Sequence, residues 1–97
     1  MKILFTPTAR KQFMGALAFI RRDNPLAATS FRQKSERVLL RLNDHPESGR
    51  MLPEFPDSLY REVFVPLYRF FYRIKGNDVW VVAVWRDAQM PDCPEEG

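Results

Sequence analysis

The fold of this chain is decided near its carboxyl end, by the apolar segments LYRFFYRIK (67–75) and VWVVAVW (79–85). Aromatic and β-branched residues dominate both segments, and the polar sequence GND (76–78) separates them. This pattern predicts two antiparallel strands joined by a tight turn. A third strand is predicted over residues 60–65, and Pro66 forms the corner before the next strand, so that the three strands make a meander.

Two helices are predicted upstream of the meander. Thr6-Pro7 is a typical helix start, because the threonine hydroxyl can cap the first turn and proline suits the first helical position. Apolar residues then recur at helical spacing as far as Ile20. Asn24-Pro25 repeats the same start signal, and the second helix is expected to end within residues 43–46. The short link predicts an antiparallel helical hairpin.

The remaining segments complete the expected architecture. A short apolar run, residues 3–5, predicts a further strand, which could pair at either of two places in the sheet. Residues 46–58 contain three prolines and a glycine, so this stretch is predicted to be a loop. The expected fold class is α+β, with the element order β-α-α-β-β-β and the helical hairpin packed on one face of a small antiparallel sheet.

The length and charge of the chain bound its organisation. A chain of 97 residues predicts one domain, expected over residues 1–90, with a loose acidic tail over 91–97. The 15 Lys and Arg residues against 12 Asp and Glu give a formal net charge of +3, and several acids gather toward the C-terminus. The basic body suits RNA, a DNA complex or an acidic protein partner, although a charge of this size can also serve solubility alone.

Composition argues against several classes of site. The single cysteine, Cys93, and the single histidine, His45, are too few for a disulfide framework or a zinc site, and no metal or cofactor is expected. No stretch reaches the about 20 apolar residues that a membrane-spanning helix needs. We therefore expect a cytoplasmic protein with no membrane partner.

Alternation along the segment 67–75 sorts its side chains onto two faces. The face that is expected to meet the helices carries Tyr68, Phe70, Tyr72 and Ile74. The opposite face carries Arg69, Phe71, Arg73 and Lys75. Since a single helix layer covers only one face of the sheet, this second face is predicted to be open.

The open face is the candidate functional surface. If the strand registers match, four arginines converge there as one concave basic surface beside two aromatic residues. The expected binding residues are Arg61, Arg69, Phe71, Arg73, Trp80 and Arg86. Guanidinium groups bind phosphate and aromatic rings stack on bases, but alternating arginines are also typical of a face that is merely solvated. An exposed Phe71 beside Trp80 and Val82 favours a covering partner, for which a protein suffices.

Segments 68–74 and 79–85, with the polar turn between them, resemble the "YRxxYRI…VxVxxV" signature of RelE/ParE toxins of type II toxin–antitoxin systems. The helical hairpin, the passage from Leu42 through His45-Pro46 to Gly49, and the strand start at Tyr60-Arg61 also fall where that family has counterparts. Each motif alone is weak. Their order and spacing together are specific, and they cover about residues 1–90.

The resemblance implies a growth-arresting toxin, which a small cognate antitoxin wraps and blocks. RelE-like members of the family enter the ribosomal A site and cleave mRNA, whereas ParE-like members poison DNA gyrase. For a nuclease, the resemblance implies Arg61, Arg69 and Arg86 as the catalytic residues.

Arg86 departs from the family pattern, because many relatives have a histidine at the end of the last strand. A histidine can act as general acid or base, but arginine stays protonated and can only stabilise developing charge. His45 is expected to cap a helix, and no Tyr, His or Lys follows Arg86. This inventory favours the ParE-like branch, with gyrase as the target. The alternatives left open are a ribosome-dependent mRNA endoribonuclease and a degenerate toxin that serves only in operon autoregulation.

Overall fold

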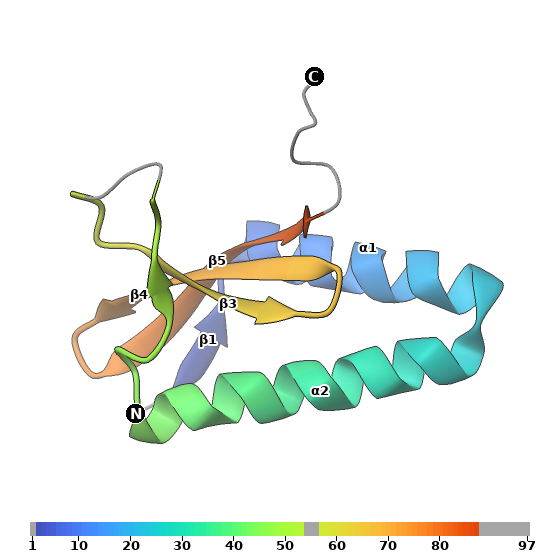
Figure 1. Cartoon of the computed structure of the whole chain (residues 1–97), viewed down its shortest axis with the longest axis horizontal. Coiled ribbons are helices and arrows are strands. Elements are labelled where there is room, and N and C mark those ends of the chain that lie inside the picture. Colours follow the sequence, from blue (N-terminus) through green and yellow to red (C-terminus); the bar gives the residue numbers. More distant parts are fainter. Residues whose placement is uncertain (1, 54–56, 88–97) are drawn as a thin grey trace.

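The computed structural model describes residues 2–53 and 57–87, and there two helices pack on one face of a five-stranded sheet (Figure 1). The elements in chain order are β1 (Ile3–Phe5), α1 (Pro7–Asp23), α2 (Pro25–Asp44), β2 (Arg50–Met51), β3 (Arg61–Val65), β4 (Tyr68–Lys75) and β5 (Asp78–Arg86). The α+β class and the helical hairpin are confirmed. The acidic tail expected over 91–97, with Cys93, lies outside the described residues. Neither helix in the described ranges combines the length and apolar character that crossing a bilayer requires.

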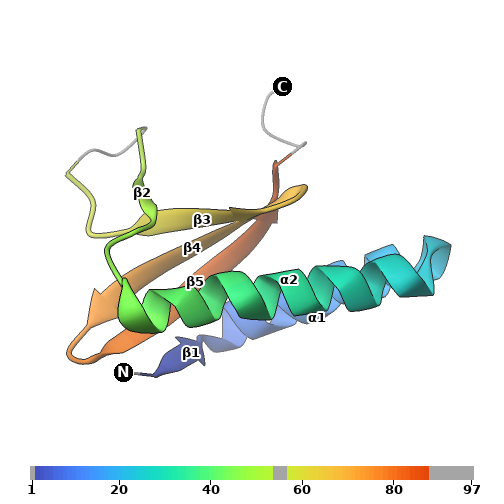
Figure 2. The same cartoon turned by 60° about the horizontal axis from the view of Figure 1, so that its bottom comes forward.

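Both helices begin where the sequence indicates. The Thr6 hydroxyl accepts a hydrogen bond from the backbone N–H of Ala9 at 3.1 Å, and a proline takes the first helical position. Asn24 caps two helices at once: its backbone N–H donates to the Ile20 carbonyl, while its side chain accepts from the N–H of Ala27. The shared cap makes the hairpin tight, and the tip of the hairpin extends well beyond the sheet (Figure 2).

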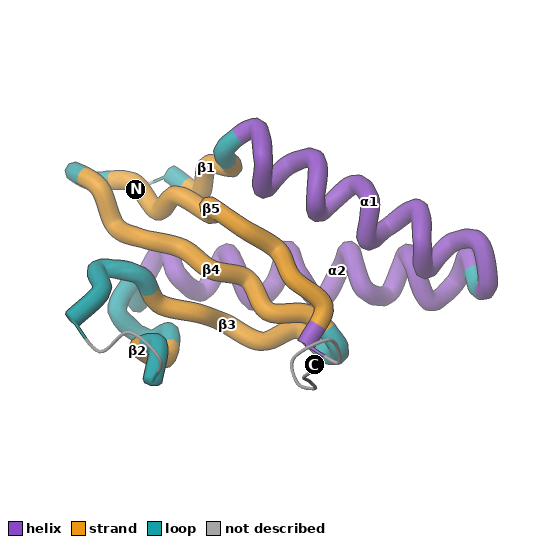
Figure 3. Tube along the Cα trace, turned by 90° about the horizontal axis from the view of Figure 1, so that it is seen from above, coloured by secondary structure: helices purple, strands orange, loops and turns teal. Residues whose placement is uncertain are grey.

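The strands lie in the order β1-β5-β4-β3-β2 (Figure 3). Strands β3, β4 and β5 form the predicted antiparallel meander. Strand β1 pairs in parallel with β5, where Leu4 lies opposite Trp80, so the sheet is mixed rather than wholly antiparallel. Part of the predicted loop over 46–58 forms the two-residue strand β2, which pairs with β3.

The core fills the space between the helices and the sheet. The Phe31 ring of α2 lies 5.0 Å from that of Tyr68, and the Phe13 ring of α1 lies 5.9 Å from that of Phe70. Phe70 and Tyr72 of β4 are fully buried. These contacts confirm the predicted helix-facing side of β4.

A β-bulge in β5 changes which of its side chains share a face. Two consecutive residues of β4 lie opposite Ala83 and Val81, so Val82 is left without a partner in β4. The extra residue shifts the alternation beyond it, and Arg86 therefore lies on the helix-facing side of the sheet. The prediction that Arg86 and Trp80 share a side is wrong for this reason.

Candidate functional site

The six predicted binding residues do not form one surface. Four of them remain on the open face, namely Arg69, Phe71, Arg73 and Trp80. Arg61 lies opposite Tyr72, and Arg86 lies opposite Tyr68. Since directly paired residues project to the same side, these two arginines are on the helix-facing side. The predicted convergence of four arginines is therefore wrong.

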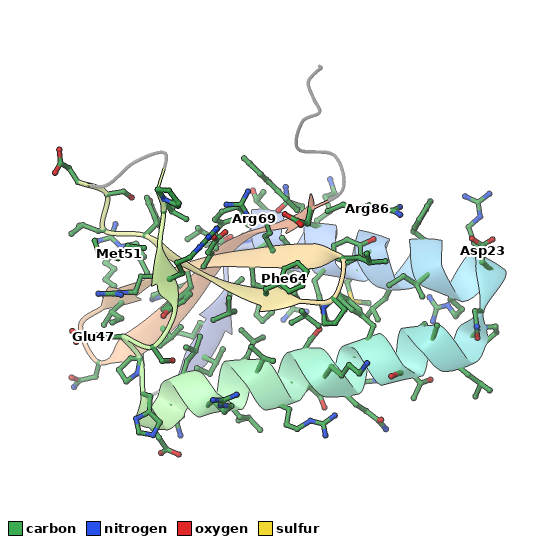
Figure 4. The ribbon with its side chains drawn as sticks, viewed as in Figure 1. Asp23, Glu47, Met51, Phe64, Arg69 and Arg86 are labelled. Atoms are coloured by element: carbon green, nitrogen blue, oxygen red, sulfur yellow. The ribbon has the colours of Figure 1, made fainter. Side chains whose placement is uncertain are left out.

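Arg69 occupies the middle of a row that crosses three strands. Phe64 of β3 lies opposite it on one side, and Trp85 of β5 lies opposite it on the other. The two aromatic residues are 56% and 50% exposed, respectively. Figure 4 shows Phe64 and Arg69 at the sheet, with Arg86 placed beside α1. The open face thus presents apolar surface on both sides of a buried arginine.

Glu62 neutralises this arginine. The Nε of Arg69 donates to Oε1 of Glu62 at 2.5 Å, and the Nε of Arg50 donates to Oε2 at 2.7 Å. The side chains of Arg69 and Glu62 are only 7% and 6% exposed. Asp87 adds a second carboxylate, 4.0 Å from the Nε of Arg69. Among the residues that the structure describes, two guanidinium groups face two carboxylates here, which leaves the centre of the open face without net positive charge to hold phosphate.

Two opposing effects act on the Glu62 carboxyl. Burial raises the pKa of Glu62, but the hydrogen bonds and positive charges of Arg69 and Arg50 together lower it by more, so its pKa lies below the ordinary value. The carboxylate is therefore ionised at neutral pH, and the Arg69 ion pair is a permanent part of the folded protein.

Phe71 is buried rather than exposed, contrary to the prediction. The Arg69 guanidinium lies 4.9 Å from its ring, and the Trp85 ring lies 5.0 Å away in an edge-to-face arrangement. The chain itself covers Phe71, so the most exposed of the described aromatic groups on this face are Phe64 and Trp85, with Trp80 partly exposed beside Arg73. Sequence reasoning missed Phe64 and Trp85 and also missed Glu62, although a charged residue within the apolar segment REVFV (61–65) was a usable signal.

Arg61 and Arg73 both border a depression at the end of the sheet near β2, although they belong to opposite faces of the sheet. The depression has a volume of about 240 Å³ and is also lined by Tyr60. The Arg73 guanidinium lies 5.9 Å from the Tyr60 ring. Nη1 of Arg61 donates to the carbonyl of Gly49 at 3.0 Å, so Arg61 anchors the loop that follows α2.

Two groups that could transfer protons lie away from the open face. The Tyr72 hydroxyl donates to the Pro46 carbonyl at 2.7 Å and accepts from the Gly49 N–H at 3.0 Å. Burial raises the pKa of Tyr72, which keeps this helix-facing hydroxyl protonated. His45 ends α2, where its backbone N–H bonds to the Arg41 carbonyl, which confirms its expected role as a cap. Within residues 2–53 and 57–87, the open face therefore holds no histidine to act as general acid or base.

Comparison with known proteins agrees with this architecture. Residues 3–91 match the sequence model of a family described as "ParE toxin of type II toxin-antitoxin system, parDE". The chain belongs to this ParE toxin family. No curated protein matches this chain.

Two solved structures resemble this ParE toxin. One is described as "Chromosomal ParDE TA system from P. aeruginosa", with a TM-score of 0.69 and 16% identity over 89% of this chain and 95% of the other. The second is described as "YoeB/ParE toxin from Agrobacterium tumefaciens", with a TM-score of 0.63 and 16% identity over 89% of this chain and 98% of the other. At this identity the likeness concerns the fold, which confirms the RelE/ParE-like architecture.

Proposed function

We propose that this ParE toxin arrests growth by binding DNA gyrase and blocking supercoiling, without cutting RNA, until a cognate antitoxin neutralises it. The observation that carries the proposal is the buried ion pair between Glu62 and Arg69 at the centre of the open face. A nuclease needs its arginine to bind the scissile phosphate as charge develops. Arg69 instead holds a carboxylate at 2.5 Å.

The positions of the other two candidate catalytic arginines support the same conclusion. Arg61 bonds to the Gly49 carbonyl beside the loop after α2, while Arg86 lies over the Phe19 ring of α1 at 5.3 Å. With Arg69 on the open face, the three side chains occupy three separate places. Phosphodiester cleavage requires its groups within reach of one phosphate, so a mode of action by binding fits this arrangement better.

The exposed aromatic residues of the open face suit the antitoxin. Phe64 and Trp85 flank Arg69, and each of the two residues is at least half exposed. Apolar groups of this size on a small protein are typical of a surface that a partner covers. We place the antitoxin on this face, where its apolar side chains would cover both rings.

Inducing the toxin in growing cells tests this proposal. We expect growth to stop and a reporter plasmid to lose negative supercoils, because gyrase is the target. Primer extension on a defined mRNA should show unchanged 5′ ends, and co-expression of the antitoxin should restore growth. New ribosome-dependent cuts that disappear in Arg69→Ala would instead establish an endoribonuclease. Normal growth after induction would leave autoregulation as the function.

A further inference from the structure

A cleft separate from the open face runs between α1 and the end of β5. Gly15, Ala16 and Phe19 line it from α1, and Val84, Trp85 and Arg86 line it from β5. Its volume is about 370 Å³, which is enough for one or two side chains of a partner.

Arg86 lies in this cleft with unused hydrogen-bonding capacity. Its Nε is buried and has no hydrogen-bond partner among the described residues. The guanidinium lies 5.3 Å from the Phe19 ring. The ring stabilises the positive charge, but it does not act as the hydrogen-bond acceptor of the Nε group. A buried donor without an acceptor is costly. The residue as a whole is partly exposed, so a carboxylate that entered the cleft would form a charge-assisted hydrogen bond with the exposed part of the guanidinium.

Apolar side chains of α1 and β5 flank Arg86. Phe19 of α1 is 48% exposed, and Val84 of β5 lines the cleft from the helix-facing side of the sheet. The Trp85 ring projects to the open face, where it packs on Phe71. Arginine and large aromatic residues are the types that carry most of the binding energy in protein interfaces. The cleft therefore combines a cation with one exposed aromatic ring, Phe19, and the apolar side chain of Val84.

Gly15 keeps the cleft open. It lies exposed within α1, and a Cβ at this position would have no atom within 4 Å. Packing among the described residues therefore does not require glycine at this position. Glycine also weakens the helix, because its helix propensity is lower than that of every residue except proline. A side chain at this position would project from the wall of the cleft toward the space that a partner would use.

The charge of α1 indicates what kind of partner fits. The helix carries four basic residues and, at its C-terminal end, a single acid, namely Arg10, Lys11, Arg21, Arg22 and Asp23. Arg10 and Arg21 line a separate depression between α1 and α2. Lys11 is four residues from Gly15 and Arg22 is three from Phe19, so these two basic residues neighbour the cleft on the helix surface. Together with Arg86 they would attract an acidic segment. The cleft offers one arginine between apolar walls rather than a row of cations, which suits a protein segment better than a phosphate backbone.

We propose that the toxin binds its target through this cleft, which accepts an acidic side chain and an adjacent apolar side chain from the surface of a protein. This inference rests on the proposed function, because it takes DNA gyrase to be that protein. The antitoxin surface around Phe64 and the target cleft around Gly15 then lie on different sides of the sheet.

The substitution Gly15→Leu fills the cleft without threatening the fold, because leucine favours a helix and meets open space. Ala18→Leu is its matched control, since Ala18 is exposed on the same helix and does not line the cleft. Each variant is expressed in cells for growth arrest and is titrated, as purified full-length protein, into a supercoiling reaction with gyrase. Thermal unfolding of both variants verifies that they fold, and Arg86→Gln serves as a second cleft variant.

We expect Gly15→Leu to abolish growth arrest and to raise the half-inhibitory concentration at gyrase by at least roughly tenfold, as for a hot-spot residue. Its melting temperature should not fall, and Ala18→Leu should behave as wild type. Growth arrest by Gly15→Leu and Arg86→Gln at the wild-type level would overturn the inference. Binding of duplex DNA or single-stranded RNA that Gly15→Leu abolishes would also overturn it. If wild type spares gyrase while only the cleft variants lose toxicity, the cleft is supported and gyrase is the wrong target.

Discussion

Replacing Glu62 with alanine is expected to lower the free energy of unfolding by about 3–5 kcal/mol, because it removes the carboxylate that the buried Arg69 guanidinium contacts through its Nε. The two side chains are 6% and 7% exposed and are joined at 2.5 Å. Asp87, at 4.0 Å from the Nε of Arg69, is half exposed and too distant to replace Glu62. The loss is a large fraction of the about 5–15 kcal/mol that stabilises a typical domain. Urea unfolding followed by circular dichroism measures it.

Glu36→Ala is the matched control for this substitution. Glu36 forms an ion pair with Arg32 at 3.5 Å on the surface of α2, and its side chain is 60% exposed. Surface pairs of this kind contribute only about 0.3–0.5 kcal/mol. If Glu62→Ala and Glu36→Ala lowered the free energy of unfolding by equally small amounts, the Glu62 ion pair would not be structurally important.

The stabilisation by Glu62 also depends on pH. Because the pKa of Glu62 is lowered in the folded protein, its contribution is complete above the ordinary glutamate pKa of about 4.3 and is lost as the pH falls through the folded value. The stability difference between wild type and Glu62→Gln should therefore be constant near neutral pH and shrink below about pH 4. A difference that stays constant into strong acid would show that the charge of Glu62 is unimportant.

Gly49→Ala is expected to cost about 1–3 kcal/mol of stability, because the added methyl group has no space. A Cβ at this position would lie 2.4 Å from the Tyr72 hydroxyl oxygen and 2.6 Å from a ring carbon. The Tyr72 ring is fully buried and cannot move aside. The loop would have to shift instead, and the hydroxyl would lose its bonds to Gly49 and Pro46.

Gly15→Ala controls for the loss of a glycine as such. Its Cβ meets open space within a helix, so we expect a gain of up to about 1 kcal/mol in stability. Thermal unfolding of the two variants measures these changes. A loss of stability for Gly49→Ala and a gain for Gly15→Ala would support the close approach of the Gly49 loop to the Tyr72 ring. A Gly49→Ala variant as stable as wild type would show that the loop does not pack against Tyr72.

Much of the fold follows from local signals in the sequence. The caps at Thr6 and Asn24 use side chains and prolines that act within one helical turn, so they are readable without tertiary information. The helix-facing side of β4 follows from simple alternation. The parallel pairing of β1 and the pairing of β2 depend on contacts between segments far apart in the sequence. Strands of three and two residues are too short for their sequence to specify which partner residues they pair with.

The candidate site was less predictable, because it depends on one extra residue. Simple alternation placed Arg86 beside Trp80, and the bulge at Val82 separates them. No turn residue or glycine marks this bulge, so the segment 79–85 reads as a regular strand. Likewise, only the pairing of β3 with β4 brings Glu62 next to Arg69, which turns a predicted phosphate site into a neutral ion pair.

Supercoiling of relaxed plasmid by purified gyrase, in the presence of increasing amounts of the wild-type toxin, tests whether this chain acts by binding gyrase. We predict dose-dependent inhibition, with RNA added to the same reaction left intact. Complete supercoiling at a large molar excess of folded toxin, taken from a preparation that arrests growth when expressed, would contradict gyrase as the target.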